Sequence, residues 1–354
     1  MSDDALTSDD EVWPRRGRAQ LLHRPDLGGV AATVRRLLAV QAQDVAAFPL
    51  ALRARMPDAT AAGVAAAREE RAIVRTWGPR GTLHLVAAAD LPWLFPLVRT
   101  SPAGSLRRLR ELGVTADLDG AVRGVDRALA GQGPLSKAEL GAALTRAGLP
   151  AEGQAIVHLA ALGARAGLVV LGPDWAGRAT YVHAADWLGA PLPVTTDHDR
   201  ALAELALRYR RAHHPAEPAD LAAWSGLPLR EVTAGWRAAG DVEPVPAVDG
   251  HTDGGGDGVR LLPGYDEYLL GWRERPVAAA YQREVHPGGG VLRATVCVRG
   301  RIAGTWRARR AGAEMKITVD PFEPQPGAVV AAIAAEAADV GRFLGVPATV
   351  VVTR

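Results

Sequence analysis

Two glutamine side chains lie two positions apart at Gln41-Ala42-Gln43, and Asp44 follows them directly. This polar run closes a segment whose apolar residues repeat with the period of a helix. If the helix continues, the two amides point about 200° apart, whereas an extended chain places both on one face. Such amides accept and donate hydrogen bonds but transfer no proton at physiological pH. The run therefore predicts either paired hydrogen-bonding groups in a site or a solvent-exposed helix cap, and surface capping is the simpler role for Asp44.

Three other polar patterns carry weaker signals. Residues 254–258 read GGGDG, but they follow no clear strand, so a flexible linker or wing tip explains them better than a phosphate or calcium loop. Asp266 and Glu267 are neighbours whose side chains point apart, which favours a turn or cap over a carboxylate pair. His213 and His214 are adjacent, not four residues apart as on a metal-binding helix face. Since the sequence also lacks a Walker A loop and the HExxH and GxSxG motifs, we expect no metal and no cofactor.

Composition limits the class of protein. The chain of 354 residues is 48% hydrophobic and 23% charged, which is typical of a globular protein. Its N-terminus is acidic and it has no run of eighteen apolar residues, so we expect a cytoplasmic protein without a membrane segment. The single cysteine, Cys297, excludes an internal disulfide and is most simply a core residue.

The charge pattern says more than the net charge of +2. Lys137 and Lys316 are the only lysines among 41 basic residues. A GC-rich genome explains much of this bias, but the arginines also gather in short clusters that could follow a phosphate backbone from one face. The clusters are Arg35/Arg36, Arg107/Arg108/Arg110, Arg208/Arg210/Arg211, Arg273/Arg275 and Arg307/Arg309/Arg310.

Local patterns predict winged helices. From Gly28 onward, Val30, Val34, Leu37 and Leu38 form one helical face that leads to Gln41. Residues 72–86 then alternate around a Pro/Gly turn, which indicates a β-hairpin. Helices followed by a two-stranded hairpin are the pattern of a winged helix.

This pattern repeats along the chain. Proline followed by an acidic-leucine pair recurs with an offset of 81 residues, another hairpin is expected at 168–183, and a helix at 229–239. The last ninety residues differ, with a long hairpin at 291–309, a strand at 314–322, one helix and a final strand at 348–354. We therefore expect an α+β fold of three tandem winged-helix units and a C-terminal β-rich, barrel-like module. The predicted division is a disordered tail at 1–12, winged helices at 13–105, 106–195 and 196–262, and the β-rich module at 263–354.

Several motifs in this order resemble the AlkZ/YcaQ family of winged-helix DNA glycosylases. They are VQAQD at 40–44, RTWGPRGTLHLV at 75–86, AEPADLAAWSGL at 216–227, LLPGYDEYLLGW at 261–272 and RGRIAGTW at 299–306. The resemblance covers nearly the whole chain from about residue 15. It implies three winged helices and a β-module around a concave DNA-binding face. The Gln-x-Gln motif is similar to that of the AlkZ branch, because the YcaQ branch has Asp in the second position.

The resemblance also implies a site. Gln41 and Gln43 are the expected catalytic residues, whose carbonyls hold a water and face an oxocarbenium-like sugar. Arg80, at the hairpin turn, is expected to reach a DNA phosphate. His84 is expected either to contact DNA beside the site or to be a hydrogen-bonded sheet residue, and Trp77 either to stack on a base or to lie in the core.

The expected function is a monofunctional glycosylase that removes cationic N7- or N3-alkylated purines from double-stranded DNA. A base that is already cationic leaves without being protonated, so two amides suffice where a glycosidase needs two carboxylates. Bulky adducts and interstrand crosslinks are possible substrates, and the enzyme is expected to act as a monomer. The alternatives are a winged-helix DNA-binding regulator without catalysis and a lesion-binding protein that has lost activity.

Overall fold

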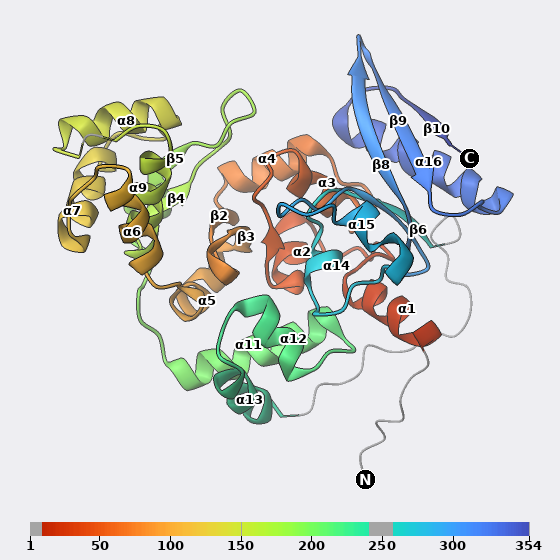
Figure 1. The fold of residues 1–354 in the computed structure, drawn as a ribbon, viewed down its shortest axis with the longest axis horizontal. Coiled ribbons are helices and arrows are strands. Elements are labelled where there is room, and N and C mark those ends of the chain that lie inside the picture. Colours follow the sequence, from red (N-terminus) through yellow and green to blue (C-terminus); the bar gives the residue numbers. More distant parts are fainter. Residues whose placement is uncertain (1–8, 150, 241–257, 354) are drawn as a thin grey trace.

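Two five-stranded sheets organise the protein, whose computed structural model describes residues 9–149, 151–240 and 258–353. The first sheet, with strand order β1-β3-β2-β4-β5, joins strands β2 and β3 near the middle of the molecule to β4 and β5 in the group of helices beside them (Figure 1). Its antiparallel strands are β1 (Val40–Gln41), β2 (Ile73–Trp77), β3 (Leu83–Ala87), β4 (Val169–Leu171) and β5 (Tyr181–His183).

Helices of the N-terminal part surround the hairpin β2–β3. The apolar face predicted for the segment after Gly28 is buried, with Val34 and Leu37 fully inaccessible. A short 3₁₀ turn, η1 (Pro79–Gly81), forms the tip of the hairpin, and η2 (Ala88–Asp90) follows it. The helices are α1 (Asp9–Ala19), α2 (Val30–Leu37), α3 (Ala47–Arg53), α4 (Ala61–Glu69) and α5 (Leu91–Val98).

A helical lobe stands beside the first sheet and contributes its strands β4 and β5 (Figure 1). Its core is rich in leucine and alanine, and Ser136 with Glu139 forms a capping box that starts one of the helices. The helices are α6 (Ala103–Glu111), α7 (Leu118–Leu129), α8 (Lys137–Arg146), α9 (Gln154–Arg165) and α10 (Ala184–Leu188).

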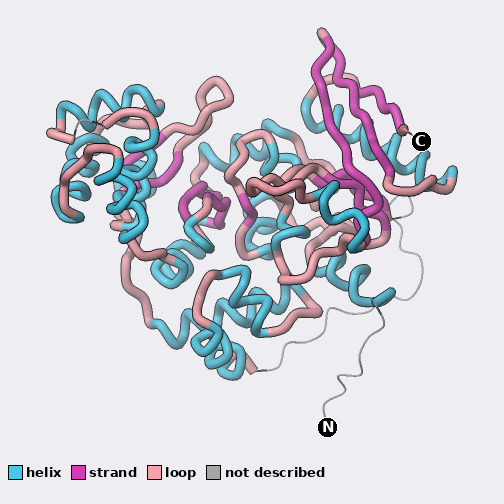
Figure 2. Tube along the Cα trace, viewed as in Figure 1, coloured by secondary structure: helices cyan, strands magenta, loops and turns pink. Residues whose placement is uncertain are grey.

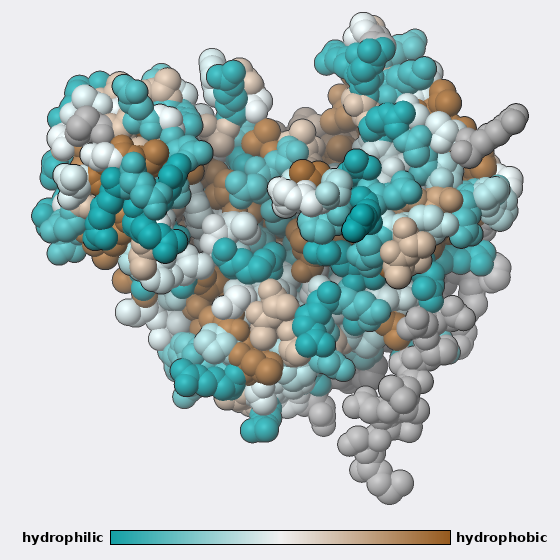
Figure 3. Space-filling view, viewed as in Figure 1, coloured by the Kyte–Doolittle hydropathy of each residue, from teal (hydrophilic) through white to brown (hydrophobic). Residues whose placement is uncertain are grey.

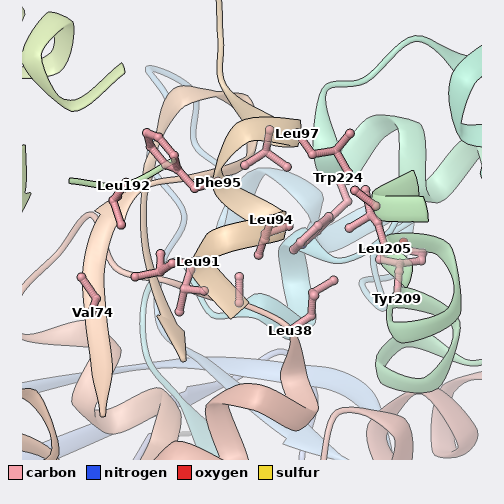
Figure 4. Packing of buried hydrophobic residues seen from close by; sticks show 14 of the residues in the cluster. Leu38, Val74, Leu91, Leu94, Phe95, Leu97, Leu192, Leu205, Tyr209 and Trp224 are labelled. Carbon is pink, nitrogen blue, oxygen red and sulfur yellow. The ribbon is translucent and has the colours of Figure 1, made fainter. Parts of the chain in front are cut away.

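A third helical group packs directly on the first sheet. Leu205, Tyr209 and Trp224 share one apolar cluster with Leu38 and Val74 from the N-terminal part (Figure 4). Because these side chains are almost completely buried, the group and the sheet form one continuous core. The helices are α11 (His198–His213), α12 (Pro218–Ser225) and α13 (Leu229–Ala238).

The second sheet curls beside a long helix at the C-terminus, with strand order β10-β9-β8-β7-β6 (Figures 1 and 2). Cys297 is buried in it, as predicted, and burial raises the pKa of its thiol to about 12. The strands are β6 (Val259–Leu262), β7 (Thr295–Val298), β8 (Arg301–Ala311), β9 (Glu314–Pro321) and β10 (Ala348–Val352). The helices are α14 (Glu267–Leu270), α15 (Gln282–Val285) and α16 (Gly327–Leu344), with the 3₁₀ turn η3 (Ala279–Tyr281).

These elements confirm the expected α+β architecture with a β-rich C-terminal module, while the division into three units stays a prediction. Helix α1 begins at Asp9, so residues 9–12 of the expected tail form its first turn. The strand at 259–262, placed in the third unit from sequence, pairs with β7 in the second sheet. The glycine-rich run at 254–258 lies mainly outside the described residues. Within the described ranges, each helix is too short or too polar to cross a membrane.

Candidate functional site

The Gln-Ala-Gln motif begins in β1 at the edge of the first sheet and ends in a bend at Gln43. Helix α2 ends at Leu37, and the positive φ of 75° at Leu38 turns the chain away from the helix axis. In β1, Gln41 pairs with His84 of β3, and the Ala42 N–H donates to the Leu83 carbonyl at 2.8 Å. The motif therefore does not continue the helix: Gln41 is in a strand, and Gln43 lies in the bend that follows it.

Hydrogen bonds connect each side-chain amide of the motif to nearby backbone. The backbone N–H of Gln43 donates to Oε1 of Gln41 at 2.9 Å, and the backbone N–H of Leu83 donates to Oε1 of Gln43 at 3.2 Å. Gln41 is 9% exposed, whereas Gln43 is exposed and lines a groove. Each carbonyl oxygen has a second lone pair, so both remain able to accept another hydrogen bond. The motif thus presents Gln43 to the groove with Gln41 directly behind it.

Arg75 of β2 holds the backbone of the motif, a role that the sequence analysis did not assign. Its guanidinium donates to the Ala42 carbonyl at 2.8 Å and to the Gln43 carbonyl at 3.2 Å. A third contact, of 3.3 Å, joins it to Asp174, which also pairs with Arg68. Burial lowers the pKa of Arg75 to about 10, so it stays charged at neutral pH. Arg75 belongs to the RTWGPRGTLHLV motif at 75–86, but nothing in the spacing of that motif indicates a contact with Ala42 or Gln43.

Glu267 holds the same strand from the other side. Its Oε2 accepts the backbone N–H of Gln41 at 3.1 Å, and its Oε1 accepts the indole N–H of Trp224. The side chain is fully buried, and burial raises the pKa of its carboxyl above the usual range. Asp266 behaves as expected, since it caps α14 and forms a two-pronged pair with Arg55 at 2.7 and 2.9 Å. The two neighbouring carboxylates do point apart, but Glu267 points at the motif.

Two residues expected to contact DNA are instead engaged inside the protein. His84 is fully buried; its Nδ1 lies 3.0 Å from the Thr82 carbonyl, and burial lowers its pKa to about 3. It therefore has no surface from which to contact DNA in this structure, and the Trp224 ring lies edge-on to it at a centroid distance of 6.4 Å. Arg80 is half-buried and donates to the backbone carbonyl of Trp224. Trp77 is half-buried against the lobe core and also lines the groove.

The groove lies between the first sheet and the helical lobe and has a volume of 1110 Å³. Figure 3 shows the surface hollowed where this lobe meets the centre of the molecule. Of the described residues that line it, Asp44 is the only carboxylate, and its Oδ1 accepts the Ala46 N–H as a turn at the start of α3. Its basic lining residues are Arg75, Lys137, His158, Arg165 and Arg178. The groove is therefore basic, with an amide of the motif in its wall.

The arginine clusters predicted from the sequence do not all reach solvent. Arg208 is buried and forms a two-pronged pair with Asp90 at 2.5 and 2.8 Å. Arg36 is partly buried between Arg208 and Arg211, and burial lowers its pKa. His213 is buried and stacks on Tyr209. No group of three or more His, Cys, Asp or Glu side chains in the described parts of the chain could hold a metal ion.

Known proteins are similar to this chain in sequence and in fold. The profile of a family described as DNA glycosylase AlkZ-like matches residues 34–343. An "interstrand DNA cross-link repair glycosylase" of Streptomyces sahachiroi is 27% identical, over 95% of this chain and 96% of its own length. The solved structure of the Streptomyces sahachiroi DNA glycosylase AlkZ superposes with a TM-score of 0.75 and 25% identity, covering 98% of this chain and 100% of that chain.

Proposed function

Because this chain belongs to the family of AlkZ-like DNA glycosylases, which hydrolyse the N-glycosidic bond between base and sugar, we propose that it releases N7- and N3-alkylated purines from double-stranded DNA. The observation that carries the proposal is the placement of Gln43 in the wall of a basic groove, with Gln41 behind it and the motif backbone fixed by Arg75 and Glu267. The two glutamines of the motif offer hydrogen-bond acceptors but no acid.

The proposed reaction needs no acid. An alkyl group on N7 or N3 makes the base cationic, so the electron pair of the breaking C1′–N bond neutralises it. The sugar becomes oxocarbenium-like, and a water that the amide carbonyls of Gln41 and Gln43 hold attacks C1′ and gives its proton to solvent. Fixed dipoles that face a developing charge contribute about 10²–10³ in rate per group. Because Arg75 and Glu267 hold the backbone in advance, the amides need little reorganisation during the reaction.

Bulky adducts and interstrand crosslinks are part of the proposal. The groove exceeds the volumes of about 300–1,000 Å³ that are common for small-molecule sites, so it has room for more than a methylated base. The Streptomyces sahachiroi relative, by its description, repairs interstrand crosslinks. We also propose that the enzyme acts as a cytoplasmic monomer, since one chain supplies the motif and both walls of the groove.

The test is release of free base from a duplex that contains one N7-methylguanine, measured by chromatography. A matched duplex with uracil is the control, and we expect its base to stay in place. Borohydride added during the reaction should trap no covalent complex, because a monofunctional enzyme forms no Schiff base. Tight DNA binding without base release would favour a non-catalytic protein. Borohydride trapping would instead implicate Lys137, the lysine that lines the groove.

A further inference from the structure

Trp175 is the most exposed large apolar side chain of the described residues, at 77%, while the next, Leu229, is 51% exposed. It belongs to the loop between β4 and β5, which projects beyond the strands in Figures 1 and 2. Single exposed apolar side chains are ordinary on protein surfaces, so exposure by itself indicates no partner. The inference depends on how this loop is built and on what lies beside it.

The tip of the loop is a tight, hydrogen-bonded turn. The Trp175 N–H donates to the Arg178 carbonyl at 2.8 Å, and the Arg178 N–H donates back to the Trp175 carbonyl at 2.9 Å. Between them, Ala176 and Gly177 have φ values of 49° and 72°, so both central residues have the left-handed backbone of a type I′ turn. The chain thus holds a nearly fully exposed indole on a defined support.

The base of the loop is tied to the catalytic motif. Asp174, directly before Trp175, accepts hydrogen bonds from Arg68 and Arg75, and Arg68 also donates to the Gly172 carbonyl at 2.7 Å. The same Arg75 guanidinium donates to the backbone carbonyl of Gln43. One side chain therefore connects the loop to the motif, and the distance between Trp175 and Gln43 is fixed by hydrogen bonds.

The surroundings of the loop identify the partner chemistry. Gly177 and Arg178, beside Trp175, line the same groove as Gln43, together with Lys137 and Arg165. An exposed aromatic ring next to cationic side chains suits a nucleobase attached to a phosphate backbone, since every base offers a π-face and every phosphate a charge. A second copy of this chain fits less well, because protein interfaces depend on larger apolar surfaces than one indole rimmed by charges.

We propose that Trp175 stacks on a nucleobase of the DNA that lies in the groove, and so anchors the DNA at a fixed position relative to Gln43. This rests on the proposed function only in taking DNA as the ligand of the groove. Stacking of one base on an aromatic side chain is worth about 5- to 100-fold in affinity. The contact requires no catalysis and is therefore measurable separately from base release.

The test compares wild type with Trp175→Ala and Trp175→Phe on a duplex in which 2-aminopurine faces a tetrahydrofuran abasic analogue. We expect Trp175→Ala to raise Kd by about 5- to 100-fold and to remove most of the change in 2-aminopurine fluorescence on binding. Trp175→Phe should keep most of both. Leu229→Ala, which removes another exposed apolar side chain, is the matched control and should bind like wild type.

Thermal unfolding checks each variant, and all melting temperatures should agree because these side chains are exposed. The proposal falls if Trp175→Ala binds within twofold of wild type and alters 2-aminopurine fluorescence as wild type does. It falls equally if this substitution converts a dimer into a monomer in sedimentation and leaves DNA affinity unchanged. Absence of base release by wild type would contradict the proposed function but not this contact.

Discussion

Two hairpins of the same sheet end in different ways. The tip of β2–β3 is closed against the third helical group, where Arg80 donates to the Trp224 carbonyl and His84 lies buried beneath the indole. The tip of β4–β5 is open and carries the exposed Trp175. We infer that the two hairpins have different roles. The first hairpin holds the Gln-x-Gln motif in place, and the second is the one that we propose contacts the DNA.

The first prediction concerns the strand that the closed hairpin supports. Replacement of Gln43 by Ala should slow base release by at least about 100-fold, since its amide faces the groove and acts mainly in the transition state. Gln41→Ala should have a comparable effect, because Gln41 completes the acceptor pair and holds the Gln43 N–H. Single-turnover rates on N7-methylguanine DNA measure the effect, and DNA affinity should stay within a few-fold. An equal loss of binding and rate would show that these residues only position DNA.

The second prediction tests the support itself. Glu267→Gln preserves shape but has only one acceptor oxygen for the N–H groups of Gln41 and Trp224. We expect the single-turnover rate to fall about 10-fold with Kd unchanged, because the motif loses its fixed position.

A second substitution separates positioning from general destabilisation. Trp224→Phe removes the competing indole donor, so Glu267→Gln should cost less rate in that background than in wild type. If the two substitutions act additively on the rate, Glu267 does not act through these two donors. If Glu267→Gln lowers only the melting temperature, its role is structural.

Sequence patterns predicted many of the helices and strands, but they left the backbone of the motif open between helix and strand and did not predict what supports it. A two-residue period places both side chains on one face only where the chain stays extended. Here Gln41 is buried in β1, whereas Gln43 is exposed in the bend that follows. Glu267 lies 226 positions away from Gln41, so their contact depends on how distant segments pack. The same applies to His84. The alternation of residues along its strand predicts a position on the sheet surface, but the structure packs Trp224 of a distant helix against its ring.

The third prediction sharpens the contrast between the two tips. Arg80→Ala should lower the free energy of unfolding by about 1–2 kcal/mol, because it leaves the buried Trp224 carbonyl without its donor. Its DNA affinity should change little, the opposite of the result expected for Trp175→Ala. Chemical denaturation and DNA titration give the two quantities, with Arg178→Ala on the open tip as the matched comparison. If Arg80→Ala loses DNA affinity but keeps its stability, the contact of Arg80 with a DNA phosphate that the sequence predicted is supported instead.

The fourth prediction follows from the buried histidines. The pKa values of His84 and His213 are lowered to about 3 by burial, while the unfolded chain has ordinary values near 6.5. Below pH 6.5 these histidines are protonated in the unfolded state but stay neutral in the folded state. The free energy of unfolding that is present above pH 6.5 therefore decreases as the pH falls toward 3. The expected slope is on the order of 1 kcal/mol per pH unit for each histidine, measured by denaturation at pH 7, 6 and 5. An unchanged stability over this range would mean that neither ring is buried in solution.

The last prediction is the smallest effect, a base-release rate that is nearly constant from about pH 6 to 8.5. The amides of Gln41 and Gln43 do not titrate, and His84, with its pKa near 3, stays neutral throughout this range. A limit on the acid side should come from Glu267, whose raised pKa brings protonation nearer to neutrality than for an exposed carboxyl. Arg80 and Arg55 face this carboxylate and oppose the shift, while burial is its largest cause.

Protonation leaves Glu267 with one good acceptor oxygen for two N–H donors. The base-release rate of wild type should therefore decrease as the pH is lowered, whereas that of Glu267→Gln should not change with pH. Rates are compared per folded molecule, because the histidines lower stability over the same pH range. A bell-shaped profile with an inflection near pH 6.5 that persists when His158, the histidine that lines the groove, is replaced by Ala would contradict the closed state of the first hairpin, since an accessible His84 would titrate there. In that case the contact of His84 with DNA that the sequence suggested becomes the better explanation.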